Sequence, residues 1–343
     1  MAPRRAINRL PYAQFKAAIL DLGLPKFQVG VIQSFLFKHG ATSFEEMTSV
    51  SKAARETLNS KYSIRSSSIA DRAVAPDSTA KVLFDWDGTV AEVVYMPMKA
   101  GKTLCISVQS GCKLRCSFCA TGRMGLNRGL SFGEILDQVI YFMGEGVVSR
   151  IVVMGMGESM DNLNELIPAL KFIMDPKGFG FSRKRITVST VGMCPELKRF
   201  ADSGCGVNLA VSLHATTDST RNKIVPIGNK YGIKEFLDTA AYYKDRANAK
   251  VTIEYLLLKD INDFEEDAIR LGKLSRTYKM PVNIICYNEV DEVPFERSDR
   301  LNEFAKILSN KALAVTIRRS KGTGIKAACG QLAGTKIDPI SQA

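Results

Sequence analysis

The feature that most constrains the fold is a regular alternation of β-rich and amphipathic helical segments from residue 103 onward. Repeated strand–helix units form a parallel sheet covered by helices. We therefore predict an α/β fold, a partial (β/α)6 barrel with its site at the carboxyl ends of the strands. The predicted strands are TLCISVQ (103–109), RIVVMGM (150–156), RITVSTV (185–191), VNLAVSLH (207–214), KVTIEYLLL (250–258) and VNIICYN (282–288), with LAVTIRRS (313–320) as a last strand.

The N-terminal part has a different pattern. Residues 8 to about 65 carry apolar residues at helical spacing and predict a small helical bundle. Residues 81–98 contain two β-rich runs joined at Asp87 and Gly88, which predict a β-hairpin. The predicted division is a helical RNA-binding domain (1–75), a β-hairpin extension (76–102), a catalytic barrel with a C-terminal cysteine loop (103–334) and a tail (335–343).

The chain is basic, with a formal net charge of +12, which favours polyanionic partners such as nucleic acid. No apolar run approaches the roughly 18 residues of a membrane span, so we expect no membrane association. The basic N-terminus lacks a secretory apolar core, and we expect a cytoplasmic protein.

Three cysteines lie in one short loop, SGCKLRCSFCATG (110–122). The spacing of Cys112, Cys116 and Cys119 lets three thiolates bind one metal centre, and thiolates suit iron–sulfur clusters or zinc. A [4Fe–4S] cluster held by three cysteines keeps one iron open. A structural zinc site needs a fourth ligand, which the loop does not supply. A non-catalytic, metal-bearing RNA-binding module remains an alternative at this point.

The pattern C-x3-C-x-aromatic-C, with Phe118 as the aromatic residue, resembles the signature of the radical S-adenosylmethionine (SAM) enzymes. The resemblance implies that the open iron of the cluster binds SAM and that the reduced cluster cleaves it to a 5′-deoxyadenosyl radical. In this superfamily a Gly-rich turn with an acidic residue follows the second strand. Gly157 and Glu158 of VVMGMGES match it and are expected to hold the SAM amino group.

The chain as a whole resembles the RlmN/Cfr family of radical SAM adenine methyltransferases of RNA. The likeness extends from KFQVGVIQSFLFKHGATSFEEMT to the C-terminal loop, so it covers nearly the whole chain. It rests on TLCISVQSGCKLRCSFCATG, VVMGMGE, VSLHA, IVPI, VTIEYLLLKDIND and AACGQLAG.

The resemblance implies two SAM molecules per turnover and two further catalytic cysteines. The first SAM methylates Cys329. The radical from the second takes a hydrogen atom from that methyl group, and the resulting methylene radical links Cys329 to adenine. A base, matched by Glu92, removes the ring proton, and Cys105 attacks the sulfur to release the product as a Cys105–Cys329 disulfide. Taken without the family, Glu92 would be a solvent-facing hairpin residue.

The same resemblance implies further SAM contacts and the substrates. The expected target is carbon 2 of an adenine in 23S ribosomal RNA and in tRNA. The alternative is a Cfr-type reaction at carbon 8, because the catalytic cysteines are shared. We also expect a monomer that uses an electron donor such as flavodoxin or ferredoxin. The SAM-contacting positions are Ser189, Ser212, Leu213, His214 and Asn288.

Cations and aromatic residues alternate in the N-terminal helices, and two more basic runs occur later. Lysine and arginine side chains in such runs contact phosphates without reading sequence. The second later run precedes Cys329 and is expected to guide RNA toward it. The candidates are Arg4, Arg5, Arg9, Lys16, Lys26 and Lys38, then Arg183, Lys184 and Arg185, then Arg318, Arg319 and Lys321.

Overall fold

The computed structural model describes residues 5–64, 67–98, 101–144, 148–291, 293–318 and 321–334. It confirms an α/β fold built on a ten-stranded mixed sheet with the strand order β14-β13-β12-β11-β10-β9-β6-β5-β4-β3. The predicted tail, 335–343, and two predicted RNA contacts, Arg4 and Arg319, lie outside the described residues.

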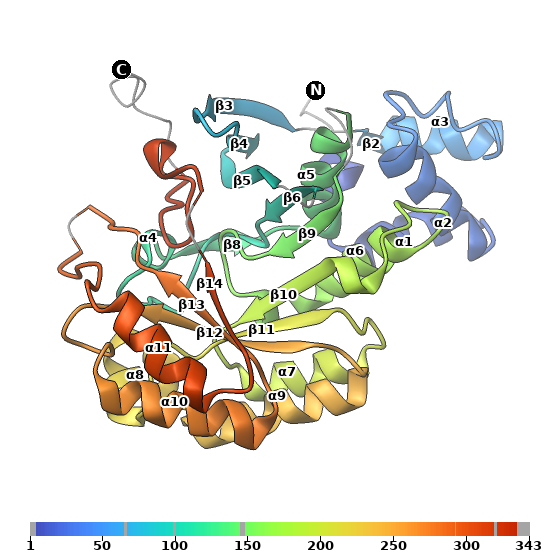
Figure 1. Cartoon of the computed structure of the whole chain (residues 1–343). Coiled ribbons are helices and arrows are strands. Elements are labelled where there is room, and N and C mark those ends of the chain that lie inside the picture. The colour runs from blue at the N-terminus through green and yellow to red at the C-terminus, as the bar shows by residue number, and fades with distance from the viewer. Residues whose placement is uncertain are drawn as a thin grey trace.

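Strand β6 and the strands β9 to β14 are parallel and form the partial barrel (Figure 1). The predicted β segments each overlap one of these strands, which confirms the alternating pattern. Their interiors are mostly buried because helices cover the outer face of the sheet. The strands are β6 (Gly101–Ile106), β9 (Arg150–Val153), β10 (Ile186–Thr190), β11 (Asn208–Ser212), β12 (Val251–Leu257), β13 (Val282–Cys286) and β14 (Val315–Arg318).

Helices connect successive parallel strands and lie along the outside of the sheet (Figure 1). Two of them end at residues with a left-handed backbone, Asn248 and Lys279, which lets the chain turn back into the next strand. Among the described residues, no helix is both long and apolar enough to cross a bilayer. The helices are α5 (Phe132–Gly144), α6 (Leu163–Met174), α7 (Cys194–Asp202), α8 (Asp218–Ile224), α9 (Ile233–Ala247), α10 (Glu265–Tyr278) and α11 (Leu301–Lys311).

The predicted hairpin belongs to the barrel sheet and does not stand apart from it. Strands β4 (Ala80–Trp86) and β5 (Thr89–Met98) are joined at Asp87 and Gly88, which both have positive φ, as a two-residue hairpin turn requires. Strand β5 pairs antiparallel with β6. A further strand, β3 (Ser68–Val74), pairs with β4 and was not predicted.

The N-terminal region contains α1 (Tyr12–Leu20), α2 (Phe27–Gln33) and α3 (Lys52–Lys61). In the last part of the predicted helical bundle, the helix begins only at Lys52. Residues 42–51 form turns instead, because the Glu46 carboxylate accepts hydrogen bonds from the backbone of Thr42 and Ser43. The N-terminal helices share one core with the barrel, since Phe132 of α5 contacts the rings of three aromatic residues, Tyr12, Phe15 and Phe37.

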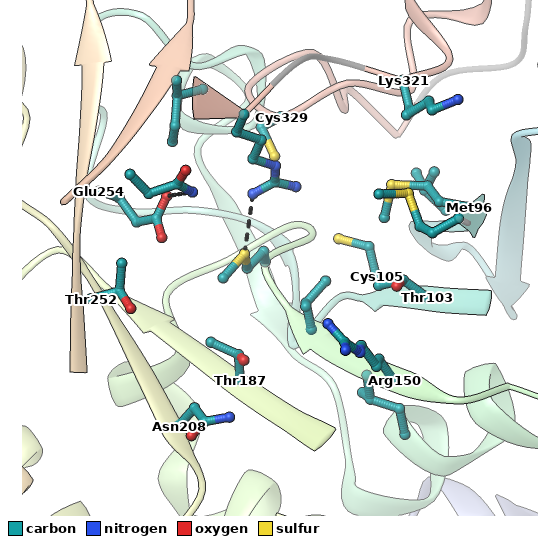
Figure 2. A pocket seen from close by; sticks show the side chains of 18 of the residues that line it. Met96, Thr103, Cys105, Arg150, Thr187, Asn208, Thr252, Glu254, Lys321 and Cys329 are labelled. Atoms are coloured by element: carbon teal, nitrogen blue, oxygen red, sulfur yellow. Dashed lines mark hydrogen bonds between the residues drawn. The ribbon is translucent and has the colours of Figure 1, made fainter. Parts of the chain in front are cut away.

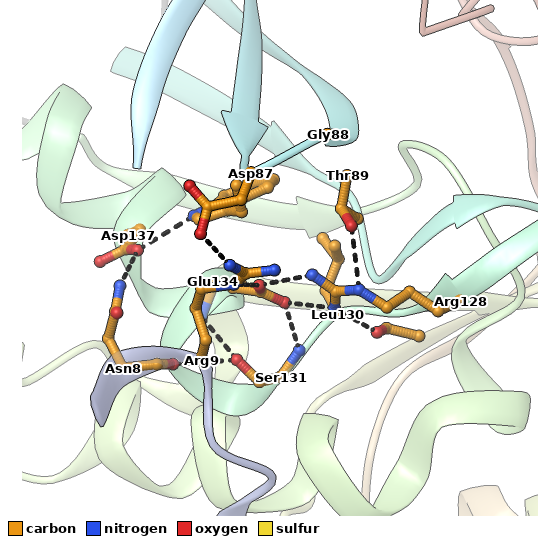
Figure 3. Close-up of polar contacts among 12 residues, drawn as sticks. Asn8, Arg9, Asp87, Gly88, Thr89, Arg128, Leu130, Ser131, Glu134 and Asp137 are labelled. Carbon is orange, nitrogen blue, oxygen red and sulfur yellow. Dashed lines mark hydrogen bonds and ion pairs between the residues drawn. The ribbon is translucent and has the colours of Figure 1, made fainter. Parts of the chain in front are cut away.

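A polar network ties the N-terminus to the hairpin turn and to α5 (Figure 3). Arg9 forms ion pairs with Asp87 and with the buried Glu134. Arg128 binds both carboxylate oxygens of Glu134, at 2.7 and 2.8 Å. Arg9 therefore has an internal structural role, and its expected place among the phosphate contacts is not supported.

Candidate active site

The three-cysteine loop lies between two short strands, β7 (Gln109–Gly111) and β8 (Leu126–Gly129), which pair antiparallel. The backbone N–H of Cys112 donates to Gly125, and that of Cys119 donates to Cys116. Cys112, Cys116 and Cys119 line one cavity of about 160 Å³ at the carboxyl ends of the barrel strands, here called the three-thiol cavity. The loop thus brings together the three residues predicted to bind the cluster.

The chemistry of these thiols fits a soft metal cluster. Burial raises the pKa of all three, to about 12 for Cys112, and the neighbouring thiols add to the effect. A metal centre stabilises the thiolate form that burial disfavours. The described residues contain no group of three or more His, Cys, Asp and Glu side chains placed to hold a single metal ion. Three soft donors facing one cavity are the donor set of an iron–sulfur cluster.

The glycine-rich turn forms another wall of the three-thiol cavity. Gly157 has φ +99°, and a Cβ at this position would lie 2.6 Å from the Gln109 Cβ, so only glycine fits. The Glu158 carboxylate accepts hydrogen bonds from the backbone N–H groups of Met160 and Val191. Burial raises its pKa, and no Lys or Arg in the described part of the chain forms an ion pair with it. A buried carboxylate of this kind suits a cationic group such as an amino group.

Ser189, Ser212 and His214 line the same cavity. His214 has a left-handed backbone, with φ +57°, and its Nδ1 accepts a hydrogen bond from the backbone N–H of Leu256. Its ring meets Phe118 edge-on. Burial, with a contribution from the charge of Arg221, lowers the His214 pKa to about 3, so the ring is neutral.

Two of the predicted SAM contacts lie elsewhere. The Leu213 side chain is fully buried in the core and is not part of the wall of the three-thiol cavity. Asn288 lies beside Cys329, where its Nδ2 donates to the Cys329 carbonyl at 3.2 Å. The contact of Leu213 with SAM therefore stays a prediction, and Asn288 contacts the C-terminal loop.

A second and larger cavity of about 530 Å³ fills the inside of the barrel, and we call it the basic cavity. Figure 2 shows Cys105, from β6, and Cys329, from the C-terminal loop, facing it. Both cysteines are free thiols. Burial and the nearby Cys329 raise the Cys105 pKa to about 12, and the charge of Arg318 opposes this. Two thiols that are 224 residues apart in the sequence thus share one cavity.

Cys329 lies where the two cavities meet, because it lines both of them. Arg318 and Glu254 also line both, and the sequence did not identify either as a residue of this junction. The charges of Cys329, Glu254 and Cys105 affect Arg318, and the Cys329 contribution is the largest cause of its raised pKa. Arg318 therefore lies at the junction, where its charge opposes the effect of burial on the Cys105 pKa, and its contact with RNA phosphates stays a prediction.

Irregular backbone carries Cys329, and contacts from other elements hold that backbone in place. The N–H of Ala120 donates to the Gly330 carbonyl at 2.8 Å, and the Thr121 hydroxyl donates to the Leu332 carbonyl at 2.6 Å. Both residues belong to α4 (Ala120–Arg123), the helix that directly follows Cys119. The cluster loop and the Cys329 loop are thus in direct contact.

Glu92 is not solvent-facing. Its carboxylate is buried, forms an ion pair with Lys81 and accepts hydrogen bonds from the backbone of residues 333 and 334. Glu92 lines neither the three-thiol cavity nor the basic cavity. The function of Glu92 as a base stays a prediction. It requires that the carboxylate leave its contacts with Lys81 and with the backbone of residues 333 and 334.

Basic residues surround the basic cavity at the amino ends of the strands. Lys184 and Arg185, predicted from the sequence, are joined there by two cations that were not predicted, Arg150 and Lys250. The predicted Lys321 lines the same cavity but follows the carboxyl end of β14. Apart from Lys321, which forms an ion pair with Asp77, these side chains are exposed.

One more buried cation beside the site had no signal in the sequence. Arg221 of α8 is fully buried, and its guanidinium donates to the carbonyls of Leu213, Tyr231 and Val191. It packs on the Phe236 ring at 5.0 Å. These contacts connect the segments that follow β10 and β11, which line the three-thiol cavity. A single arginine in a short helix carries no sequence pattern from which such contacts could be predicted.

The partial barrel and the three-thiol cavity define a radical SAM enzyme. Residues 106–272 match the Radical SAM superfamily, which implies a [4Fe–4S] cluster and SAM as cofactors. A radical SAM methyltransferase from Sphaerobacter thermophilus has a similar structure, with a TM-score of 0.85, 34% sequence identity, and coverage of 96% of this chain and 100% of that chain.

The chain belongs to the RlmN family of RNA methyltransferases. The dual-specificity RNA methyltransferase RlmN of Buchnera aphidicola is 38% identical over 334 residues, covering 94% of this chain and 92% of the relative. The probable dual-specificity RNA methyltransferase RlmN of Spiroplasma citri is 37% identical over 328 residues, covering 94% and 95%. These findings confirm the resemblance and the enzyme class, and they do not support a non-catalytic metal module.

Proposed function

We propose that this enzyme methylates carbon 2 of an adenine in RNA and that Cys329 carries the carbon. The observation that supports the proposal most strongly is the position of Cys329, which lines both the three-thiol cavity and the basic cavity. A thiol at this junction can face the cofactor side first and the RNA side afterwards without leaving its loop.

The residues that would hold the cofactors are those of the three-thiol cavity. Cys112, Cys116 and Cys119 would bind the cluster, and Glu158 would bind the amino group of SAM. When bound, the cluster and SAM supply the methyl group and the radical chemistry, and we propose two SAM molecules per turnover. Ser189, Ser212 and the neutral His214 supply polar groups on the same wall.

The two thiols then complete the transfer. Addition of the methylene radical joins the Cys329 sulfur to adenine. The adduct then loses the ring proton to a base and one electron, which the cluster held by the three cysteines would accept. The Cys105 thiolate attacks the Cys329 sulfur, and the sulfur–carbon bond breaks. Its electron pair stays on the methylene carbon, which gains a proton and becomes the methyl group. The disulfide formed between the two cysteines must be reduced before the next turnover.

Arg318 assists this release step. The pKa of Cys105 is about 12, so little thiolate is present near neutral pH. The positive charge of Arg318 stabilises the thiolate form and opposes the effect of burial. It lies at the junction with Cys329, where the attacking thiolate is needed.

RNA would approach at the amino ends of the strands. Arg150, Lys184, Arg185 and Lys250 surround the entrance there and are placed to bind phosphates. A target adenine must leave its stack to reach thiols inside a barrel, which favours a looped or single-stranded RNA segment. SAM and RNA would then approach Cys329 from opposite sides.

The finer details stay predictions from the family resemblance. They are the use of both 23S ribosomal RNA and tRNA, an electron donor such as flavodoxin or ferredoxin, a monomeric state and a cytoplasmic location. The named relatives are dual-specificity enzymes, which favours two RNA substrates. The alternative reaction at carbon 8 uses the same cysteines, so the described thiols do not discriminate against it.

Mass spectrometry of nucleosides tests the regiochemistry. Ribosomal RNA and tRNA from cells lacking a resident adenine-C2 methyltransferase are analysed with and without this protein. We expect 2-methyladenosine only when the protein is expressed. The appearance of 8-methyladenosine instead would overturn the assignment to carbon 2, and the absence of any methylated adenine would overturn the proposed function.

A further inference from the structure

The Glu92 carboxylate and its partner Lys81 form a buried pair outside both cavities. Lys81 lies on β4 and Glu92 on β5, and the register pairs Lys81 with Val94 and Leu83 with Glu92. The two residues are therefore diagonal neighbours, within reach of each other. Their side chains are 7% and 1% exposed, and Lys81 Nζ lies 2.7 Å from Glu92 Oε1.

The second carboxylate oxygen binds the chain just after Cys329. Glu92 Oε2 accepts a hydrogen bond from the backbone N–H of Ala333 at 2.8 Å and another from that of Gly334 at 3.1 Å. Hydrogen bonds from backbone amides to a buried carboxylate are charge-assisted and strong. Oε2 of Glu92 is thus bound by the C-terminal loop, while Oε1 forms the ion pair with Lys81 and accepts no hydrogen bond among the described residues.

Lys81 binds the same loop on the other side of Cys329. Its Nζ donates to the Lys326 carbonyl at 3.4 Å, three residues before the cysteine. The pair therefore contacts the loop both before and after Cys329, from two strands that are continuous with the barrel sheet.

We propose that Lys81 and Glu92 act as positioning residues, which together hold the 321–334 loop so that Cys329 lies at the junction of the two cavities. This inference rests on the proposed function of Cys329. It differs from the predicted role of Glu92 as a base, because a positioning role is needed already before RNA is bound. It also gives Lys81 a role, for which the sequence offered no signal.

Methylation of Cys329 distinguishes positioning from a role as base. That half-reaction involves no adenine and no ring proton, so the loss of a base alone leaves it unchanged. The loss of loop positioning slows it, because the sulfur must lie close to the methyl donor. A residue that touches neither cofactor nor RNA, Lys81, should then reproduce the effect of changing Glu92.

The experiment uses the full-length protein, reconstituted without oxygen, with SAM that carries a deuterated methyl group and without RNA. Mass spectrometry of the Cys329 peptide measures the labelled fraction over time. Hydrogen–deuterium exchange of the 331–334 segment gives a readout that is independent of activity. The variants are Glu92→Gln, Lys81→Met, Lys81→Arg and the double variant, which leaves no unpaired buried charge.

A matched control comes from another pair with one buried carboxylate. Arg300 lies 3.4 Å from the buried Asp263, on the α10–α11 side of the barrel. Arg300→Met removes its cation without touching Lys81, Glu92 or their contacts with the loop. Iron content and thermal melting of each variant show whether the fold and the cluster are retained.

We expect label incorporation into Cys329 to fall at least about tenfold in Glu92→Gln, Lys81→Met and the double variant. Exchange of the 331–334 amides should become faster in the same three proteins. Lys81→Arg should recover part of both losses, and Arg300→Met should resemble the unchanged protein.

Unchanged labelling and unchanged exchange in Glu92→Gln and Lys81→Met would overturn the positioning role. If Lys81→Met and the double variant do not fold, Lys81→Arg and Glu92→Gln decide the question by exchange alone. If Cys329 of the unchanged protein takes up no label, the proposed function fails, and the amide exchange still tests the loop contacts separately.

Discussion

Cys105 and Cys329 face the same cavity but are held in different ways. Cys105 lies in β6, where the neighbouring strands β5 and β9 pair with it at Val94 and Val152. Cys329 lies on a loop without strand pairing in the described residues, and side-chain contacts from Glu92, Thr121 and Asn288 hold it. The comparison indicates that one thiol is fixed by the sheet, and that the other is placed by contacts able to open.

The difference suits the two proposed tasks. A carbon carrier that serves two cavities must change its orientation, and a loop permits that at low cost. The thiol that releases the product must meet the sulfur at one place, and a strand in the middle of a sheet supplies a fixed position. Each prediction below tests one side of this comparison.

The largest effect is expected from Cys329→Ala. Without the carrier sulfur no carbon reaches adenine, so both methylated product and covalent protein–RNA adduct should be absent. Nucleoside mass spectrometry and denaturing gels of the anaerobic reaction measure the two products. Methylation that persists in this variant would show that Cys329 is not the carrier.

Cys105→Ala should leave the first part of the reaction intact and block the last. Cys329 is still methylated and still joins adenine, but no thiolate attacks its sulfur. A covalent protein–RNA adduct should therefore accumulate while free methylated RNA falls to background. A variant that turns over normally without adduct would refute the assignment of Cys105 as the releasing thiol.

The pKa of about 12 for Cys105 predicts a pH dependence for release. Below that value the thiolate fraction rises about tenfold per pH unit, so decay of the adduct should accelerate about a hundredfold between about pH 7 and 9. Arg318→Met removes a cation that lowers the Cys105 pKa, and should slow decay roughly tenfold at fixed pH.

A higher pH should restore the release rate of Arg318→Met, because it replaces the lost thiolate. The decay of adduct isolated from a single turnover gives the rate directly. A rate that does not depend on pH in either protein would contradict thiolate attack as the limiting event.

The smallest effect is expected at the entrance of the basic cavity. Lys250→Ala should weaken RNA binding a few-fold and reduce the slope of log affinity against log salt concentration by about 0.7, one phosphate contact with single-stranded RNA. Fluorescence anisotropy over a salt series measures this. Lys234→Ala, an exposed lysine of α9 paired with Asp238, is the control and should change neither value.

The sequence predicted what depends on local pattern. The alternation of strands and helices predicted the barrel, and the spacing of Cys112, Cys116 and Cys119 predicted a shared metal centre. Gly157 and Glu158 were identified through the resemblance to the radical SAM enzymes, in which a Gly-rich turn with an acidic residue follows the second strand. In each case the residues that must come together are close in the sequence or repeat with the period of a regular element.

The sequence did not predict contacts between distant segments. Glu92 binds the backbone of Ala333, 241 residues away, and such a contact leaves no periodic trace. Arg318 belongs to a basic run that suggested RNA phosphates, yet its side chain lines both cavities, as Cys329 does. Strand β3 was not predicted because the short sequence SIADRAV has no clear strand pattern of its own, and it forms a strand by pairing with β4.

The central claim is that the carbon passes through Cys329, and a labelled chase tests it most directly. Cys329 is first loaded with a deuterated methyl group from SAM, the protein is freed of that SAM, and RNA and unlabelled SAM are added for one turnover. We predict that the methylated adenosine carries the deuterium label and that Cys329 loses it. Unlabelled methyladenosine with the label still on Cys329 would contradict the account.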